Sequence, residues 1–373
     1  MNVDIITLHR AENYGSVLQT FALQKKIEEL GHVARILDYH PERYTNKGKL
    51  RRLKKQSKKF NNPLLLLIAK ILIYPSYLKK NKVFSDFVAK YLKLSPFSFA
   101  TNDEAKRKLD KWADCYCTGS DQVWNSHWNE CVEKALFLDF IPKGKKAFSY
   151  ASSIGLSQLP SNEIDETRNL LKKYIRVSVR ENSGVDIIKQ LGFEDVEQCL
   201  DPTLLLSKEE WSNYVDDCDS GKEYILTYNL HHDPEIDKFA TALGEKYNVP
   251  VRNISYNWHD IVRKGHLCWC PSVERFLGLI KNAKFVIADS FHATVFSIIF
   301  EKQFVTITPE VASSRITSVL QTLGIVNRNI AKYTGVETIE TPIDYISVKR
   351  RLSTEIKKSE LFLKDVLLSA KVL

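Results

Sequence analysis

Short apolar runs alternate with amphipathic stretches through the first half of the chain. Residues 3–8 and 33–39 are apolar runs typical of buried strands, and residues 16–30 between them carry apolar side chains at helical spacing. The same pattern predicts further strands at 113–118, 145–151 and 175–179, and further helices at about 162–174 and 183–191. Such alternation favours a parallel sheet covered by helices.

The second half repeats this pattern and ends in a long last helix from about residue 343 to 373. The predicted strands are 224–229, 250–255, 284–288 and 303–307, and the predicted helices are 234–247, 272–282 and 292–300. We therefore expect an α/β protein of two Rossmann-like domains, residues 1–205 and 206–373. Two such domains in tandem are the plan of a GT-B-like enzyme, whose substrate cleft lies between the domains.

A basic, mostly helical insertion at about residues 41–95 interrupts the first domain. Between residues 47 and 82 it carries twelve Lys or Arg and no Asp or Glu. Its apolar run, residues 63–74, is shorter than the ~20 residues that span a bilayer. Two interpretations stay open: the insertion packs its leucines on the core, or it contacts an anionic membrane surface. Nucleic-acid binding is not expected, because no reader motif accompanies the basic residues.

Length and composition agree with this plan. A chain of 373 residues suits two domains, and 44% hydrophobic with 27% charged residues is normal for a folded protein. The first residues lack the pattern of a signal peptide, so we expect a cytoplasmic protein, peripheral at the inner face of the membrane if the insertion contacts lipid. The seven cysteines include two CxC pairs, which lack the usual spacing of zinc ligands. We expect structural cysteines and no metal.

Four polar segments follow predicted strands and precede predicted helices, where helix N-termini present free N–H groups to anions. In the first, residues 9–19, Gly15 would let the backbone approach a ligand; an ordinary strand-to-helix turn is the alternative. The second is residues 119–125, whose small, acidic and amide side chains suit hydroxyl recognition. Local turn chemistry around Asp121 is the alternative there.

The other two segments carry cationic or titratable groups. Arg180 ends a strand directly before a helix, and its guanidinium suits a phosphate or carboxylate, unless it forms a salt bridge with Glu181 or Asp201. In residues 288–297, His292 would lie in the first turn of a helix with its ring facing the cleft. A lone histidine is usually structural, but this one stands at a strand-to-helix junction beside a carboxylate and hydroxyl groups, which favours a functional role.

In this order, the four segments resemble the polysaccharide pyruvyl transferase family. The resemblance rests on residues 13–19 (NYGSVLQ), 119–125 (GSDQVWN), 178–181 (SVRE) and 289–292 (DSFH), with Arg315 in its C-terminal part. It spans roughly residues 3–325 and does not cover the basic insertion or the last helix.

The resemblance implies a GT-B-like fold and phosphoenolpyruvate as the donor substrate. The acceptor would be a sugar in a lipid-linked or nucleotide-linked precursor of a bacterial surface polysaccharide, such as a capsule or exopolysaccharide, and the product a pyruvyl ketal. No cofactor or metal is implied. Many members carry Arg two positions before the histidine, where this chain has Ser290. A nucleotide-sugar-dependent GT-B glycosyltransferase would explain this difference, and a non-catalytic scaffold in polysaccharide assembly is a third interpretation.

For the transfer we expect His292, Asp289 and Asp121 to be catalytic. His292 would do acid–base work or meet the leaving phosphate, and Asp289 or Asp121 would orient sugar hydroxyls or act as base. Arg180 would hold phosphate or carboxylate with support from Arg315, and would meet His292 across the cleft. The other expected substrate-binding residues are Ser290, Asn13, Gly15, Ser16, Gln19, Ser120 and Asn125.

Overall fold

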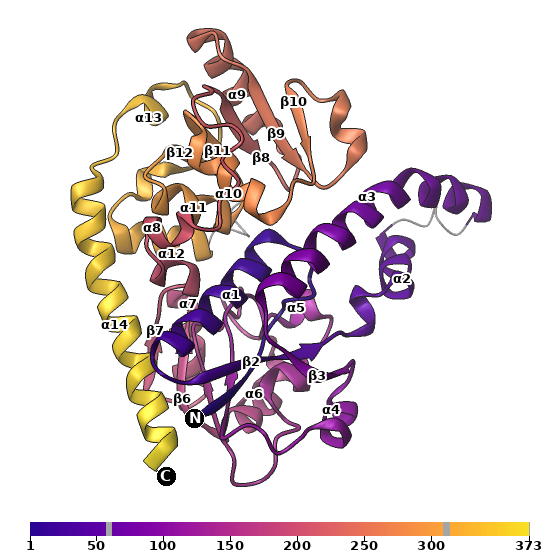
Figure 1. The fold of residues 1–373 in the computed structure, drawn as a ribbon, viewed down its shortest axis with the longest axis vertical. Helices are drawn as coiled ribbons and strands as arrows, with labels where there is room; N and C mark the ends of the chain where they lie inside the picture. The colour runs from indigo at the N-terminus through magenta and orange to yellow at the C-terminus, as the bar shows by residue number, and fades with distance from the viewer. Residues whose placement is uncertain (57–61, 309–313, 373) are drawn as a thin grey trace. The chain divides into compact units, whose positions relative to one another are not determined.

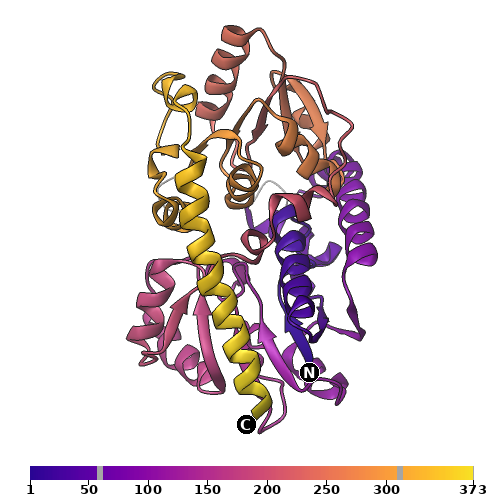
Figure 2. The ribbon, with the colours of Figure 1, turned by 60° about the vertical axis from the view of Figure 1, so that its left-hand side comes forward.

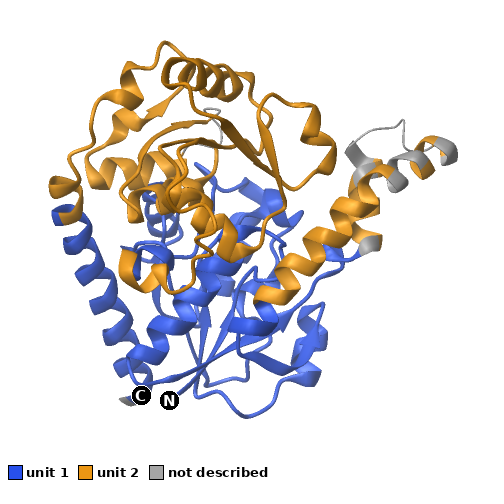
Figure 3. Cartoon of the chain, turned by 45° about the horizontal axis from the view of Figure 1, so that its top comes forward, with its two compact units in different colours: residues 1–45, 88–206, 350–373 blue, residues 46–87, 207–349 orange. Residues whose placement is uncertain are grey.

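Two parallel β-sheets form the framework of the computed structural model, which describes residues 1–56, 62–308 and 314–372 (Figure 1). Part of the basic insertion, residues 57–61, and the chain directly before Ser314 lie outside the described residues. The chain divides into two compact units. Unit 1 comprises residues 1–45, 88–206 and 350–373, and unit 2 comprises residues 46–87 and 207–349 (Figure 3).

Unit 1 contains a seven-stranded sheet in the order β3-β2-β1-β4-β5-β6-β7, with every neighbouring pair parallel. Its strands are β1 (Asn2–Ile6), β2 (Val33–Tyr39), β3 (Leu94–Phe99), β4 (Cys115–Thr118), β5 (Lys146–Ser149), β6 (Tyr174–Val179) and β7 (Val196–Gln198). Its helices include α1 (Tyr14–Glu29), α4 (Asn102–Lys108), α5 (Ser126–Asn129), α6 (Ile164–Leu171) and α7 (Asn182–Gln190). The apolar core forms between these strands and helices.

Unit 2 contains a six-stranded sheet, again with every neighbouring pair parallel, in the order β10-β9-β8-β11-β12-β13. Its strands are β8 (Ile225–Tyr228), β9 (Val251–Ser255), β10 (His266–Trp269), β11 (Phe285–Ala288), β12 (Gln303–Ile307) and β13 (Asn329–Ile330). Its helices include α8 (Lys208–Ser212), α9 (Pro234–Tyr247), α10 (Val273–Asn282), α11 (Phe291–Ile299), α12 (Ser314–Leu323) and α13 (Glu337–Glu340). The prediction of two parallel-sheet α/β domains is therefore confirmed.

The basic insertion forms α2 (Asn46–Gln56) and α3 (Pro63–Tyr91), and its residues 46–87 belong to unit 2, not to the first domain as expected. The contacts explain this difference. The indole Nε1–H of Trp258 donates to the carbonyl oxygen of Leu72 over 2.5 Å, and its backbone N–H donates to the hydroxyl of Ser76 over 2.9 Å. Phe84 packs edge-on against Tyr256. Residues 72–84 of α3 are thus held on unit 2 by residues that follow β9.

The last helix, α14 (Tyr345–Val372), was expected in the second domain, but its residues 350–373 belong to unit 1. Figure 2 shows this helix passing over the strands of the unit 1 sheet. The hydroxyl of Ser359 accepts the N–H of Leu200 over 3.0 Å, and the ring of Phe362 lies against Tyr150 and Arg176. A chain terminus that returns to cover the first sheet is a tertiary feature, so the order of predicted elements could not indicate it.

Gly278 in α10 allows a loop to approach the helix closely. A Cβ at this position would lie 1.9 Å from the carbonyl oxygen of Asp216. We therefore expect Gly278→Ala to lower the free energy of unfolding of unit 2 by about 1–3 kcal/mol, as overpacking does, although alanine favours a helix. Gly244→Ala in α9 is the matched control, because its nearest neighbouring atom is 3.2 Å away. Calorimetric melting tests this; a Gly278→Ala protein as stable as the Gly244→Ala protein would contradict it.

Candidate functional site

Each sheet has one place where the strand order reverses, and in open α/β sheets ligands bind beyond the carboxyl ends of the strands at that place. In unit 1 the reversal lies between the neighbouring strands β1 and β4, and in unit 2 between β8 and β11. The expected segments 9–19 and 119–125 follow β1 and β4, and the segment 288–297 follows β11. Three of the four sequence motifs therefore border a reversal point.

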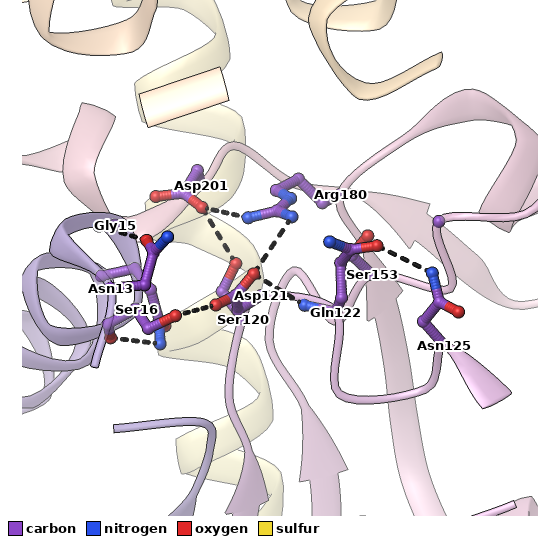
Figure 4. Close-up of polar contacts among 12 residues, drawn as sticks. Asn13, Gly15, Ser16, Ser120, Asp121, Gln122, Asn125, Ser153, Arg180 and Asp201 are labelled. Carbon is purple, nitrogen blue, oxygen red and sulfur yellow. Dashed lines mark hydrogen bonds and ion pairs between the residues drawn. The ribbon is translucent and has the colours of Figure 1, made fainter. Parts of the chain in front are cut away.

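In unit 1 a short hydrogen bond joins the two segments at the reversal point (Figure 4). The hydroxyl of Ser16, in the first turn of α1, donates to a carboxylate oxygen of Asp121 over 2.5 Å. Asp121 has a φ of 74°, in the left-handed region that few residues other than glycine adopt. Its second oxygen accepts the N–H of Gln122 over 2.8 Å. The structure thus brings Ser16 and Asp121 together, and it also shows the local bond that the turn interpretation expected.

Asn13, Gly15 and Gln19 serve the local structure of α1. The Asn13 side chain caps the helix by accepting the N–H of Gly15 over 2.9 Å, so Gly15 lies within the first turn of α1 and not in the preceding loop as expected. The amide nitrogen of Gln19 donates to the hydroxyl of Thr7 and to the carbonyl oxygen of Ser16, each over 2.9 Å. Gln19 is fully buried, and it joins α1 to the end of β1.

Ser120 and Asn125 lie at the two ends of the loop that holds Asp121. The Ser120 hydroxyl donates to Asp201 over 3.1 Å, and Asn125 caps α5 by accepting the N–H of Trp128 over 3.0 Å. Trp124 between them is buried, and its ring stacks on Phe137 with the centroids 5.1 Å apart. Trp124 therefore anchors this loop to the core of unit 1.

Arg180 follows β6 as expected, but its side chain is buried and paired inside the unit. Its Nη1 lies 2.6 Å from a carboxylate oxygen of Asp201, and its Nη2 lies 3.8 Å from Asp121. Burial opposes the charge of the guanidinium, but Asp201, Asp121 and Glu181 raise the pKa of Arg180 above its ordinary value. The salt-bridge interpretation of Arg180 is thus the one that the structure shows, and the pair also holds the carboxylate of Asp121 in a charged network.

In unit 2 a histidine that the sequence analysis missed lies at the reversal point. The ring Nδ1 of His231, in the loop after β8, lies 2.8 Å from the carboxylate of Asp289, which directly follows β11. Asp289 also accepts the backbone N–H groups of Leu230 and His231 over 2.8 Å each. The Asp289 side chain is 0% exposed, whereas that of His231 is 52% exposed. A fixed carboxylate therefore orients an accessible imidazole, the arrangement that acid–base histidines need.

The electrostatics of this pair favour a protonated ring. The hydrogen bond with Asp289 raises the pKa of His231 above its ordinary value, against partial burial and the positive charge of Arg315, which lower it. The sequence did contain a signal for His231, since it stands between a predicted strand and a predicted helix. Only the sheet order reveals that the loop after β8 borders the segment after β11.

The other expected residues of unit 2 gather at the N-terminus of α11. Ser290 caps this helix by accepting the N–H of Ala293 over 3.5 Å, and His292 lies in the first turn as expected. His292 is 7% exposed, so its ring is more enclosed than we expected for a residue facing a cleft. Arg315 of α12 lies with its guanidinium carbon 6.0 Å from the centroid of the Phe291 ring. These residues, with Asp289 and His231, form one cluster on unit 2.

The expected residues thus fall into two clusters. Ser16, Ser120, Asp121 and Arg180 belong to unit 1, and Asp289, Ser290, His292 and Arg315 belong to unit 2. The expected meeting of Arg180 with His292 joins residues of different units and stays a prediction. Across residues 1–56, 62–308 and 314–372, no three His, Cys, Asp or Glu side chains gather as metal ligands would. Cys115 and Cys117 are buried in β4, as the strand prediction required.

Two parallel-sheet α/β domains define a GT-B fold, and similar solved structures agree. UDP-GlcNAc 2-epimerase from Neisseria meningitidis bound to UDP-GlcNAc matches with a TM-score of 0.55 at 10% identity, over 99% of this chain and 100% of its own. UDP-N-acetylglucosamine 2-epimerase from Rickettsia bellii matches with a TM-score of 0.56 at 11% identity, over 99% and 96%. At these identities the likeness shows the fold alone.

The sequence itself gives the family. The family profile described as polysaccharide pyruvyl transferase matches residues 13–310, and this chain belongs to that family. The resemblance seen in the four segments is therefore confirmed, and membership makes the chain a transferase of polysaccharide biosynthesis. Among curated proteins, none is similar enough in sequence to count as a relative.

Proposed function

We propose that this protein transfers pyruvate from phosphoenolpyruvate to a sugar of a bacterial surface-polysaccharide precursor, forming a ketal. Family membership supports the class of reaction. The observation that carries the proposal is the His231–Asp289 pair, which sets an accessible, oriented acid beside the N-terminus of α11 at the reversal point of unit 2.

The reaction requires one proton to arrive and a phosphate to leave. Protonation of the methylene carbon of phosphoenolpyruvate gives a cationic centre at C2. One sugar hydroxyl adds there and loses its proton; the C2–O bond to phosphate then breaks, and phosphate leaves with the electron pair. A second hydroxyl adds to C2 and loses its proton, which closes the ketal ring. The enzyme must therefore supply an acid, a base and a site for the phosphate.

His231 is our candidate for the acid. Its Nδ1 is bonded to Asp289, so Nε2 is the nitrogen that carries the exchangeable proton to the substrate. Asp289 already accepts three N–H groups, which leaves it little capacity to bind a sugar hydroxyl. We therefore assign Asp289 to positioning of His231, not to the role of base. Asp121 of unit 1, positioned by Ser16 and Arg180, is the candidate that orients a sugar hydroxyl or takes its proton.

The phosphate site is assigned to Arg315, His292 and the first N–H groups of α11. Ser290 caps the helix and carries no charge, so the cation that many family members place there must come from another element. Arg315 is the candidate because it lies by Phe291 and its charge acts on His231. A helix N-terminus adds favourable N–H groups for an anion.

Arg315→Ala is expected to weaken phosphoenolpyruvate binding by about 10- to 100-fold, since a charge-assisted hydrogen bond is lost. Titration calorimetry with phosphoenolpyruvate and with UDP-GlcNAc measures this, and Arg350→Ala, which removes an exposed cation elsewhere, is the control. Tight binding of UDP-GlcNAc with no binding of phosphoenolpyruvate would instead support the nucleotide-sugar glycosyltransferase, which the uncharged Ser290 also fits.

Mass spectrometry of the surface glycan tests the product. A deletion strain should lose the mass of one pyruvyl ketal per repeating unit, and the wild-type gene should restore it. An unchanged glycan in the deletion strain would contradict the proposal. If the ketal is lost, the polysaccharide precursor isolated from the deletion strain is the acceptor for assays of the purified enzyme.

A further inference from the structure

The outer part of α3 exposes apolar side chains that no other part of the described chain covers to any large extent. Six of them between residues 65 and 78 are 38% to 57% exposed. They are Leu65, Leu67, Leu72, Ile73, Tyr74 and Leu78. The interpretation that the insertion packs its leucines on the core therefore does not hold for these residues. The buried residues of α3 include Ser76, within the same stretch, and Phe84 and Phe87 further along the helix.

The exposed apolar residues occupy more than one side of the helix. At about 100° per residue, Leu65 and Leu72 fall on one side, and Leu67 and Tyr74 fall about 200° away. A helix that is apolar all round is normally enclosed by protein or lipid. An exposed cluster of this kind marks an interaction surface.

The residues around this surface are basic. Residues 47–82 contain twelve Lys or Arg and no Asp or Glu. Lys47, Arg51 and Lys54 of α2 line one hollow together with Leu50. The two helices contact each other, because the ammonium of Lys49 lies 4.4 Å from the centroid of the Tyr77 ring. Apolar and cationic groups thus belong to one surface, formed by α2 and the outer part of α3.

We propose that this α2–α3 surface binds an anionic lipid bilayer, with the apolar side chains of α3 in the acyl region and the basic side chains of α2 on the head groups. Charge selects this partner over a second copy of the chain, because two copies would bring like charges together. Among the residues that the structure describes, no helix is long and apolar enough to cross a bilayer. The binding is therefore peripheral, with two signals, apolar insertion and cationic attraction. It does not depend on the reaction proposed above.

Flotation of the full-length protein with vesicles tests the proposal. The protein should bind vesicles of mixed phosphatidylcholine and phosphatidylglycerol, and bind pure phosphatidylcholine much more weakly. Each basic residue at such a surface changes binding by about fivefold, so a Lys47→Gln, Arg51→Gln, Lys54→Gln variant should lose on the order of 100-fold in partition coefficient. Binding should also weaken from about 0.1 M to about 1 M salt, as screening shortens to about 3 Å.

Two further variants make the result specific to this surface. Leu65→Ser, Leu67→Ser, Leu72→Ser should lose at least about tenfold in binding, because each leucine gives up its transfer from water. Lys143→Gln, Lys189→Gln, Lys264→Gln removes the same charge from exposed sites elsewhere and should bind like the wild type. All three variants should keep the wild-type melting temperature, because the replaced side chains are exposed.

Three outcomes would overturn the proposal. The first is absence of binding to the mixed vesicles at low salt. The second is an equal loss of binding in the α2 charge variant and in its control with the lysines replaced elsewhere. That result would show that binding depends on the net charge of the protein and not on this surface. The third is a wild-type dimer in sedimentation that the leucine variant makes monomeric, without vesicle binding, which would assign the surface to a second copy.

Discussion

His231→Asn is expected to lower the rate of ketal formation from phosphoenolpyruvate by roughly 10²- to 10⁴-fold, the range for loss of a general acid or base. The reason is geometric: Asp289 fixes Nδ1 of the ring at 2.8 Å, so the imidazole needs no reorganisation to deliver its proton from Nε2. Release of phosphate from phosphoenolpyruvate, with the polysaccharide precursor from the deletion strain as acceptor, measures the rate. Binding of phosphoenolpyruvate should change much less than the rate.

The matched control is His232→Asn at the next position. His232 has a φ of 55°, which asparagine tolerates well, and it contacts Arg263 instead of Asp289. This variant should keep most of the activity. Equal rates for the two variants would remove His231 from the mechanism and leave His292 as the candidate acid.

The pH dependence gives a test that a purely structural histidine would not pass. As an acid, His231 acts when protonated, so the rate should fall as the pH rises through its pKa. Asp289 raises the pKa of His231, so Asp289→Asn should move this alkaline limb to lower pH. Arg315 lowers the pKa, so Arg315→Ala should move the limb to higher pH. If the alkaline limb of the pH–rate profile stays at the same pH in both variants, the limb reports the titration of a group other than His231.

The strand–helix pattern was sufficient to predict the framework of both units, because buried parallel strands and amphipathic helices leave clear apolar periods. It was weakest for the edge strands β3, β7, β10 and β13. An edge strand pairs on one side only and is short or partly exposed, so its sequence lacks a continuous apolar run. The pattern also could not show that residues 46–87 and 350–373 pack on units other than those expected.

The sequence indicated the segments of the candidate site one by one, but it did not indicate which side chains pair with each other. The motif residues Ser16 and Asp121 stand far apart in the sequence and meet because β1 and β4 are neighbours. His231 and Asp289 meet because β8 and β11 are neighbours. A strand order is a tertiary property, so a histidine without a motif around it could be identified only after the sheet was known.

Arg180 illustrates a second limit of prediction from the sequence. An arginine suits both a ligand-binding site and a buried ion pair, and the sequence does not distinguish the two. In the structure its side chain and that of Asp201 are 2% and 0% exposed. We therefore expect Arg180→Ala to lower the free energy of unfolding of unit 1 by about 3–5 kcal/mol, since the carboxylate of Asp201 would stay buried without its cation. This differs from what a residue holding the phosphate or carboxylate of the donor would give, since loss of such a residue would chiefly weaken donor binding.

Calorimetric melting of three variants separates the two interpretations of Arg180. Arg168→Ala removes an arginine from an exposed pair with Asp165 and should cost no more than about 1 kcal/mol. Arg180→Met combined with Asp201→Asn should recover part of the stability lost in Arg180→Ala, because the double variant no longer leaves the buried carboxylate of Asp201 without its cation. An Arg180→Ala protein that melts like the wild type but binds phosphoenolpyruvate poorly would instead support Arg180 as a residue that binds the donor. The buried pair predicts the reverse: a large loss of stability that the second substitution partly restores.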